Sequence, residues 1–253
     1  MYADSASVLL DSIQAPDELT DKDFAHWCML CGKVTDEAAT GLLPIYQWQR
    51  AQQWFTEHGT AEEQAQIDLY LGRAYVEDGE YDKAMQIYAD ALQLAKEHQA
   101  YNVAGYICAY MADLYGFRDI TSECLKKREE ACEFFKKAEN YKSYAYSLKD
   151  LAGEWAILDS FACTIPLLQK ADSISQLLHN KNLTAAIANA FALIYEMQGK
   201  YNEAETAYLK AISTRSEESY KDSIGLLKVY IKNNKLGKAY ELIKAITVHN
   251  DIA

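Results

Sequence analysis

The same residue types recur at steps of 40 along much of this chain. Starting from Ala51, the steps reach alanine at every position through Ala211, a span of 160 residues. Three more columns each keep one chemical type. They are Gly32, Gly72, Ala112, Ala152 and Ala192; Cys31, Leu71, Met111, Leu151 and Phe191; and Tyr75, Tyr115, Trp155 and Tyr195. A fixed period of this length predicts a repeat protein, in which each unit packs on its neighbours.

Each repeat predicts two antiparallel helices. The first helix carries a large apolar, a small and an aromatic residue at spacings of 0, +1 and +4, and the second carries small, aromatic and small residues, as in Ala84, Tyr88 and Ala91. These are spacings of single helix faces. Small residues let two helices approach closely, and the large ones fill the groove beside them. Gly79 and Gly199 fit the ends of first helices. One hairpin cannot bury such a face alone, so the hairpins must stack.

This pattern resembles the tetratricopeptide repeat. The residues that carry the resemblance are Leu71, Gly72, Tyr75, Gly79, Tyr81, Ala84, Tyr88 and Ala91 in one unit, and Ala192, Tyr195, Gly199, Tyr201, Ala204, Tyr208 and Ala211 in another. The usual repeat has about 34 residues, and the longer step here resembles the long-helix arrays of peptide-sensing bacterial regulators and some scaffold proteins. The resemblance implies an all-α, right-handed superhelical solenoid of antiparallel helix hairpins.

We expect a single tetratricopeptide-like α-solenoid over residues 1–253, with no linker rich in Gly, Ser or Pro. The predicted elements are a short helix at 5–13 and hairpins at about 21–58, 61–99, 101–139, 141–179, 181–216 and 217–248. Pro44 fits the beginning of a helix. Pro166 predicts a second helix that starts late, with Thr164 as its N-cap. Cys124 and Arg128 replace the small and aromatic residues of one second helix.

Composition narrows the functional classes. The formal net charge of −12 argues against nucleic acid as a partner. No segment has the roughly 18 consecutive apolar residues of a membrane span, and no signal-peptide pattern opens the chain. Half of the residues are hydrophobic, so the chain can bury a core.

No residue is assigned a catalytic role, and the sequence predicts neither an enzyme nor a cofactor. The chain lacks a phosphate-binding glycine loop and the common hydrolase motifs. Cys28 and Cys31 form a Cys-x-x-Cys pair that could be a redox or metal half-site, but no second ligand pair completes a metal site, and buried structural thiols are the favoured interpretation. His58, His98 and His179 fit the ends of second helices.

The resemblance also implies a binding face. In tetratricopeptide arrays the first helices line the concave surface, which would hold an extended peptide or a partner helix. The residues carried over to that face are Tyr70, Arg73, Tyr106, Tyr110, Asp113, Phe117, Tyr146, Lys149, Asp150 and Asn189. The alternative, weighted equally, is that the tyrosine rings pack against the neighbouring hairpin. Arg73 and Asp113 stand where the chaperone-binding members of the family need Asn, which disfavours a chaperone carboxyl terminus as the ligand.

The amino-terminal segment "ADSASVLLDSIQAPDELTDKDFAHWCMLCGK" is similar to the start of uncharacterised tetratricopeptide proteins of Bacteroidota that are described as regulators. There it follows a signal peptide or a lipid-attachment cysteine, so Met1 is interpreted as an expression start that replaces a removed signal. Two functions are left open. The favoured one is a protein- or peptide-binding scaffold in a larger envelope-associated regulator. The other is a self-contained cytoplasmic peptide-sensing regulator or adaptor.

Overall fold

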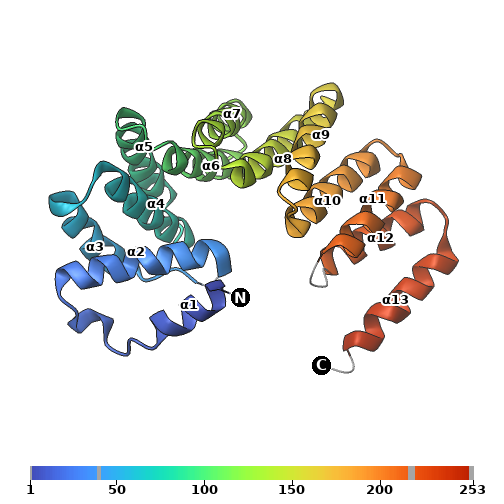
Figure 1. The fold of residues 1–253 in the computed structure, drawn as a ribbon. Helices are drawn as coiled ribbons and strands as arrows, with labels where there is room; N and C mark the ends of the chain where they lie inside the picture. Colours follow the sequence, from blue (N-terminus) through green and yellow to red (C-terminus); the bar gives the residue numbers. More distant parts are fainter. Residues whose placement is uncertain (1, 39–40, 216–219, 251–253) are drawn as a thin grey trace. The chain divides into compact units, whose positions relative to one another are not determined.

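The computed structural model describes residues 2–38, 41–215 and 220–250. Within these ranges all regular elements are α-helices, apart from one short 3-10 helix (Figure 1). The chain divides into two compact units, Met1–Glu139 and Asn140–Ala253. The expectation of a single solenoid domain stays a prediction.

The first unit contains seven α-helices among its described residues. They are α1 (Tyr2–Asp11), α2 (Asp21–Ala38), α3 (Ile45–His58), α4 (Ala61–Glu77), α5 (Tyr81–Glu97), α6 (Tyr101–Phe117) and α7 (Thr121–Lys137), and the 3-10 helix Pro16–Glu18 lies between α1 and α2. Helix α4 pairs with α5, and α6 pairs with α7. Pro44 occupies the N-cap position of α3, where its missing N–H removes no helical hydrogen bond.

The second unit contains six α-helices among its described residues. They are α8 (Tyr141–Ile157), α9 (Phe161–Leu177), α10 (Lys181–Met197), α11 (Tyr201–Thr214), α12 (Tyr220–Lys232) and α13 (Leu236–Asn250). Helix α8 pairs with α9, and α10 pairs with α11. From α4 to α11 the helices begin at residues 61, 81, 101, 121, 141, 161, 181 and 201, so successive helices start 20 residues apart. No helix among the described residues is long and apolar enough to cross a membrane.

Short turns with one left-handed residue join these helices. Gly79 and Gly199 have φ of 78° and 69°, a conformation that glycine adopts without steric cost. The N–H of Glu80 closes the turn on the carbonyl of Tyr75 at 2.8 Å, as in the usual glycine-ended helix. The other left-handed turn residues are Gln99, Asp119, Glu139, Asp159, His179 and Asn234. These six turns therefore form without glycine, whereas glycine made the turns at Gly79 and Gly199 visible in the sequence.

The small-and-aromatic pattern is the contact surface of each hairpin. Ala84, Tyr88 and Ala91 are fully buried. A Cβ added at Gly72 would lie 2.3 Å from Cε1 of Tyr88, so the ring rests directly on the backbone of α4. The spacing that predicted a close helix pair therefore describes a real contact, because only glycine leaves room for this ring.

The predicted late start of the helix around Pro166 is wrong. Helix α9 begins at Phe161 and contains Pro166. Thr164 is not an N-cap, since both its backbone N–H and its hydroxyl donate to the carbonyl of Ser160, at 3.2 Å and 3.1 Å. Thr164 and Leu168 are completely buried. Burial of this face outweighs the single helical hydrogen bond that proline removes near the start of the helix.

Candidate functional site

The residues predicted for a concave face lie on the first helices of the hairpins, in both units. Tyr70 and Arg73 belong to α4, and Tyr106, Tyr110, Asp113 and Phe117 belong to α6. These six lie in the first unit. Tyr146, Lys149 and Asp150 belong to α8, and Asn189 belongs to α10, all in the second unit.

Tyr70 is a core residue. Its side chain has no exposed surface, and its ring centroid lies 5.3 Å from that of Trp48. A Cβ added at Gly32 would lie 2.4 Å from Cε2 of Tyr70, so the ring packs on the backbone of α2. For Tyr70 the packing interpretation is correct, and the ring is not available to a ligand. Tyr106 is half-buried and meets Phe135 edge-on at 4.8 Å.

Arg73 lies over aromatic rings in the first unit. Its guanidinium carbon lies 4.9 Å from the ring centroid of Tyr110 and 5.9 Å from that of Tyr70. Tyr110 in turn stacks on Tyr88 at 6.3 Å. A cation over an aromatic face is attracted by the ring quadrupole. Arg73 and Tyr110 are both half-buried, so this surface offers a partly exposed cation held in a fixed place.

Arg128 explains one departure from the repeat. It stands in α7 where α5 has Tyr88, and it reaches back to the first helix, where its Nη2 lies 2.6 Å from Oδ1 of Asp113. Only 12% of the Arg128 side chain is exposed. The substitution places a charge pair where α5 and α11 place the rings of Tyr88 and Tyr208. Phe117, at the end of α6, is largely exposed and touches Tyr81 at 5.1 Å.

A buried carboxylate in the second unit binds two polar side chains. Asp222 of α12 has 1% of its surface exposed. It accepts a hydrogen bond from Nδ2 of Asn189 at 2.5 Å and one from Nε of Arg215 at 3.1 Å. A buried charge needs partners of this kind, because loss of hydration is costly. Asn189 was predicted for the binding face, and here it helps to hold Asp222.

The remaining predicted residues are linked through Tyr146, which lies within electrostatic reach of both Arg215 and Asp150. Burial raises the pKa of Tyr146, while the positive charge of Arg215 lowers it and the charge of Asp150 raises it. Lys149 forms an ion pair with its neighbour Asp150. We call this set the polar cluster. Its members are Tyr146, Lys149, Asp150, Asn189, Arg215 and Asp222.

Arg215 and Asp222 were missed from the sequence. A usable signal existed, because Asp222, Leu226 and Val229 have the spacing of one helix face, and the last two are core residues. A charge on a core face needs a buried partner. Its partner Arg215 follows the last residue of α11, outside the helical positions that the repeat aligns.

Apolar residues follow the polar cluster along α8 and α10. On α10, Leu193 and Met197 follow Asn189 at successive steps of four residues, and on α8 Gly153 and Ile157 follow Lys149 in the same way, so each set lies on one helix face. Leu193, Met197 and Ile157 are exposed. A Cβ added at Gly153 meets nothing within 4 Å. We call Gly153, Ile157, Leu193 and Met197 the apolar strip.

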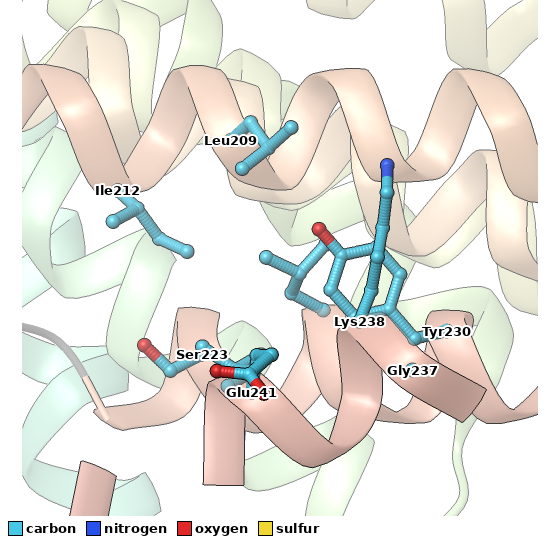
Figure 2. A pocket seen from close by; sticks show the side chains of 9 residues that line it. Leu209, Ile212, Ser223, Tyr230, Gly237, Lys238 and Glu241 are labelled. Atoms are coloured by element: carbon cyan, nitrogen blue, oxygen red, sulfur yellow. The ribbon is translucent and has the colours of Figure 1, made fainter. Parts of the chain in front are cut away.

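A separate groove of about 500 Å³ lies between α11, α12 and α13 (Figure 2). Leu209 and Ile212 project into it from α11, and Tyr230 and Lys238 lie together on its other side. The complete lining is Leu209, Ile212, Ser223, Leu226, Tyr230, Gly237, Lys238, Glu241 and Leu242. The groove is apolar with a few polar groups, which is the usual make-up of a ligand-binding concavity.

One repeat earlier a smaller groove of about 350 Å³ is lined by matching residues, among them Ala188, Phe191 and Tyr195. There Lys210 of α11 forms an ion pair with Asp172 of α9 at 3.2 Å. A step of 40 from Asp172 reaches Ile212. The groove of Figure 2 therefore has the aliphatic side chain of Ile212 at the position that corresponds to Asp172, the ion-pair partner of Lys210.

A half-buried carboxylate lies between α3 and α4 in the first unit. Nε2 of Gln52 donates to Oδ1 of Asp68 at 2.7 Å. Burial raises the pKa of Asp68 to about 6, a rise that the Gln52 hydrogen bond reduces and the charge of Asp90 increases.

The cysteines carry no sign of reactive chemistry. All six are free thiols, and Cys163 is the exposed one. Burial raises the pKa of Cys28, and raises that of Cys31 to about 12, so both thiols of the Cys-x-x-Cys pair stay protonated. Among the described residues, no group of three or more His, Cys, Asp or Glu side chains is placed to hold a metal ion.

Comparisons with known proteins agree with the fold. Models of the tetratricopeptide repeat match residues 71–99 and 184–218. No curated protein matches the sequence. BtubC from P. vanneervenii is similar in structure, with 15% identity, coverage of 90% of this chain and 91% of that one, and a TM-score of 0.69. The apo form of RapI has 14% identity, coverage of 100% and 73%, and a TM-score of 0.71.

A Rap protein in complex with competence and sporulation factor is also similar, with 16% identity, coverage of 96% of this chain and 70% of that one, and a TM-score of 0.68. Together these matches support a tetratricopeptide-repeat family and an all-α, tetratricopeptide-like solenoid fold for the chain. The long-repeat variety and the resemblance to Bacteroidota proteins stay predictions.

Proposed function

We propose that this chain is a non-enzymatic scaffold that binds a peptide or a protein segment on the first-helix face of its second unit. The observation that carries the proposal is the spacing of four residues by which the apolar strip follows the polar cluster along α8 and along α10, two helices that contact each other. Tyr146, Lys149 and Arg215 are partly exposed polar groups at one end. Exposed Leu193 and Met197 lie at the other. A peptide offers both kinds of partner, in its backbone amides and its apolar side chains.

In this proposal the ligand lies over Gly153, where the space is open. Nothing lies within 4 Å of a Cβ added at Gly153, so a bound aliphatic side chain could approach the backbone of α8 there and would lose water contact. Asn189 and Arg215 are already held by Asp222, so they meet a ligand without first losing side-chain freedom. Such preorganisation lowers the entropic cost of binding. One similar structure, a Rap protein, is a complex with competence and sporulation factor, which is consistent with ligand binding by this fold.

The cellular setting is a further part of the proposal. The favoured form is the sensory or interaction part of a larger envelope-associated regulator, on the strength of the amino-terminal resemblance. The alternative is a self-contained cytoplasmic peptide-sensing regulator or adaptor. Fractionation of source cells, with the native mass read on the same blot, separates the two. A larger membrane-associated species supports the first form, and a free species near 28.6 kDa supports the second.

The binding face is tested with a random peptide library and three glycine variants. Peptides selected on the native chain are scored by the rise in melting temperature, because a ligand of the folded state at 100 times its Kd stabilises by about 2.7 kcal/mol. Gly153→Trp covers the open space over α8, Gly153→Ala leaves most of it open, and Gly237→Trp fills the groove of Figure 2 instead. The proposal predicts that Gly153→Trp alone abolishes the rise. Equal binding by Gly153→Trp and the native chain would overturn it.

A further inference from the structure

Helix α12 exposes a stripe in which lysines alternate with isoleucines. We call Lys221, Ile224, Lys228 and Ile231 the basic stripe. They follow one another at steps of three, four and three residues, so they lie on one face of the helix. Ile224 and Ile231 are 49% and 54% exposed, and both lysines are exposed as well. The other side of α12 carries core residues such as Val229, so the basic stripe is the solvent side of the helix.

Helix α12 lies beside α10 in the second unit. Near the start of α12, Asp222 accepts a hydrogen bond from Nδ2 of Asn189 at 2.5 Å. Near its end, Nζ of Lys232 lies 2.7 Å from Oε1 of Glu196. Both contacts join α10 to α12 in the same direction along the two helices. The first helices of this unit therefore run side by side from α8 through α10 to α12.

The repeat register places the basic stripe on the face that the proposed function assigns to the ligand. The left-handed turn residue after α12 lies 35 positions beyond the one after α10. At this step Asn189 of the polar cluster corresponds to Ile224, and Leu193 of the apolar strip corresponds to Lys228. Corresponding positions of stacked repeats lie on the same side of an array. The basic stripe therefore extends the face of α8 and α10 by one more helix.

The charge of this face is opposite in sign to that of the whole chain. Helices α8, α10 and α12 contain six lysines and four acids, whereas the chain carries a net charge of −12. The first helices of the other unit, α2, α4 and α6, contain three Lys or Arg residues and nine acids. Asp150, Glu196 and Asp222 are each paired with a basic side chain. Lys221 and Lys228 form no ion pair with another described residue, so their charge is open to a ligand.

We propose that the ligand of this face is an acidic peptide, whose carboxylates pair with Lys221 and Lys228 while its apolar side chains cover Ile224 and the space over Gly153. The inference rests on the proposed function and names the class of its ligand. Exposed lysines attract carboxylates and steer them towards the face. Packed helices lie about 8–10 Å apart and an extended peptide advances about 3.3 Å per residue, so the acid for Lys228 should stand about five or six residues from the apolar residue over Gly153.

Two peptide libraries of equal length test the charge of the ligand. Both mix apolar residues with charged ones, which are only Asp and Glu in the acidic library and only Lys and Arg in the basic library. Each library is selected on the full chain, and fluorescence anisotropy gives the Kd of its tightest peptide at low and high salt. The acidic peptide should bind at least about tenfold more tightly than the basic one and should lose affinity as salt rises.

A double charge reversal on α12 tests the role of its lysines. Lys221→Glu with Lys228→Glu reverses the charge of the basic stripe. Lys22→Glu with Lys136→Glu is the matched control, because both residues are exposed, lie in the first unit and change the net charge by the same amount. Circular dichroism verifies that each variant stays folded. The stripe variant should bind the acidic peptide roughly tenfold more weakly and the basic peptide more tightly, whereas the control should bind both as the native chain does.

The outcomes separate this inference from the proposed function. A native chain that prefers the basic peptide and loses it in Gly153→Trp would overturn the acidic ligand and leave the proposed function standing. An acidic peptide that binds the stripe variant and the native chain equally well would also overturn the inference, since the lysines of α12 would then take no part. If neither library yields a peptide, or if Gly153→Trp binds both peptides as the native chain does, the proposed function fails and the inference fails with it.

Discussion

Two helical glycines of the second unit should respond in opposite ways to the same substitution. Gly225 in α12 and Gly153 in α8 are both interior helical positions. A Cβ added at Gly225 would lie 2.4 Å from Cε1 and Cζ of Tyr208, whereas one added at Gly153 meets nothing within 4 Å. Helix propensity favours alanine over glycine equally at the two positions. Packing between hairpins leaves room for the new Cβ only at Gly153.

The magnitudes follow from these two effects. Replacing a helical glycine by alanine stabilises by roughly 0.5–1 kcal/mol. Forcing an extra carbon into a filled contact costs about 1–3 kcal/mol. Gly153→Ala should therefore stabilise the protein by the first amount. Gly225→Ala carries both terms, and the two variants should differ in unfolding free energy by about 1–3 kcal/mol.

Urea unfolding followed by circular dichroism measures both variants under one protocol. The same pair is then made in a Tyr208→Leu background, which removes the ring atoms that the new Cβ would meet. There the difference between the two alanine variants should shrink towards zero. Equal stabilisation by both substitutions in the native background would refute the close packing of α12 on α11, and so would a difference that persists without the ring.

Three further outcomes are expected. Ala131→Leu should cost about 1–3 kcal/mol in urea unfolding, because Ala131 is fully buried in α7; a neutral result would mean that this contact is wrong. Asp68→Asn should stabilise the protein by about 1–3 kcal/mol at pH 7 and by much less at pH 4. The folded state holds a proton on Asp68 up to about pH 6, whereas the unfolded chain releases it near pH 4, so the unfolding free energy falls as the pH rises through this window. A gain that is the same at every pH would contradict the burial of that carboxylate. Maleimide should label one thiol quickly, at Cys163, which is exposed while the pKa of Cys28 and Cys31 is raised by burial; a second fast thiol in Cys163→Ser would contradict this.

The fold was predictable because the packing contacts between helices require the same residue types at a fixed period along the sequence. A ring such as Tyr88 needs a small partner such as Gly72, and the same pair of types must return in every hairpin that stacks in the same way. The left-handed residue of a turn was predictable only where it is glycine. His179 and Asn234 adopt the same left-handed conformation, at a cost that the surrounding helices impose. The helix start predicted from Pro166 was wrong because burial of a helix face can outweigh the low helix propensity of one residue.

The candidate site was only partly predictable, because a periodic pattern gives helix faces but not the depth of each side chain. Tyr70 and Tyr110 both lie on first helices, yet the ring of Tyr70 fills a space over Gly32 and is lost to the core. Asn189 was found because it repeats a face position. Arg215 was not, since it lies outside a helix and joins the cluster only through the folded chain.

Hydrogen exchange with the tightest peptide from the library tests the central claim most directly. The amides of α8 and α10 should exchange more slowly when the peptide is bound, with the largest change around Gly153 and Leu193 and no change for Gly153→Trp. Protection confined to α11 and α13 would place binding in the groove of Figure 2 and contradict the account. A library that yields no peptide able to protect any helix would contradict it as well.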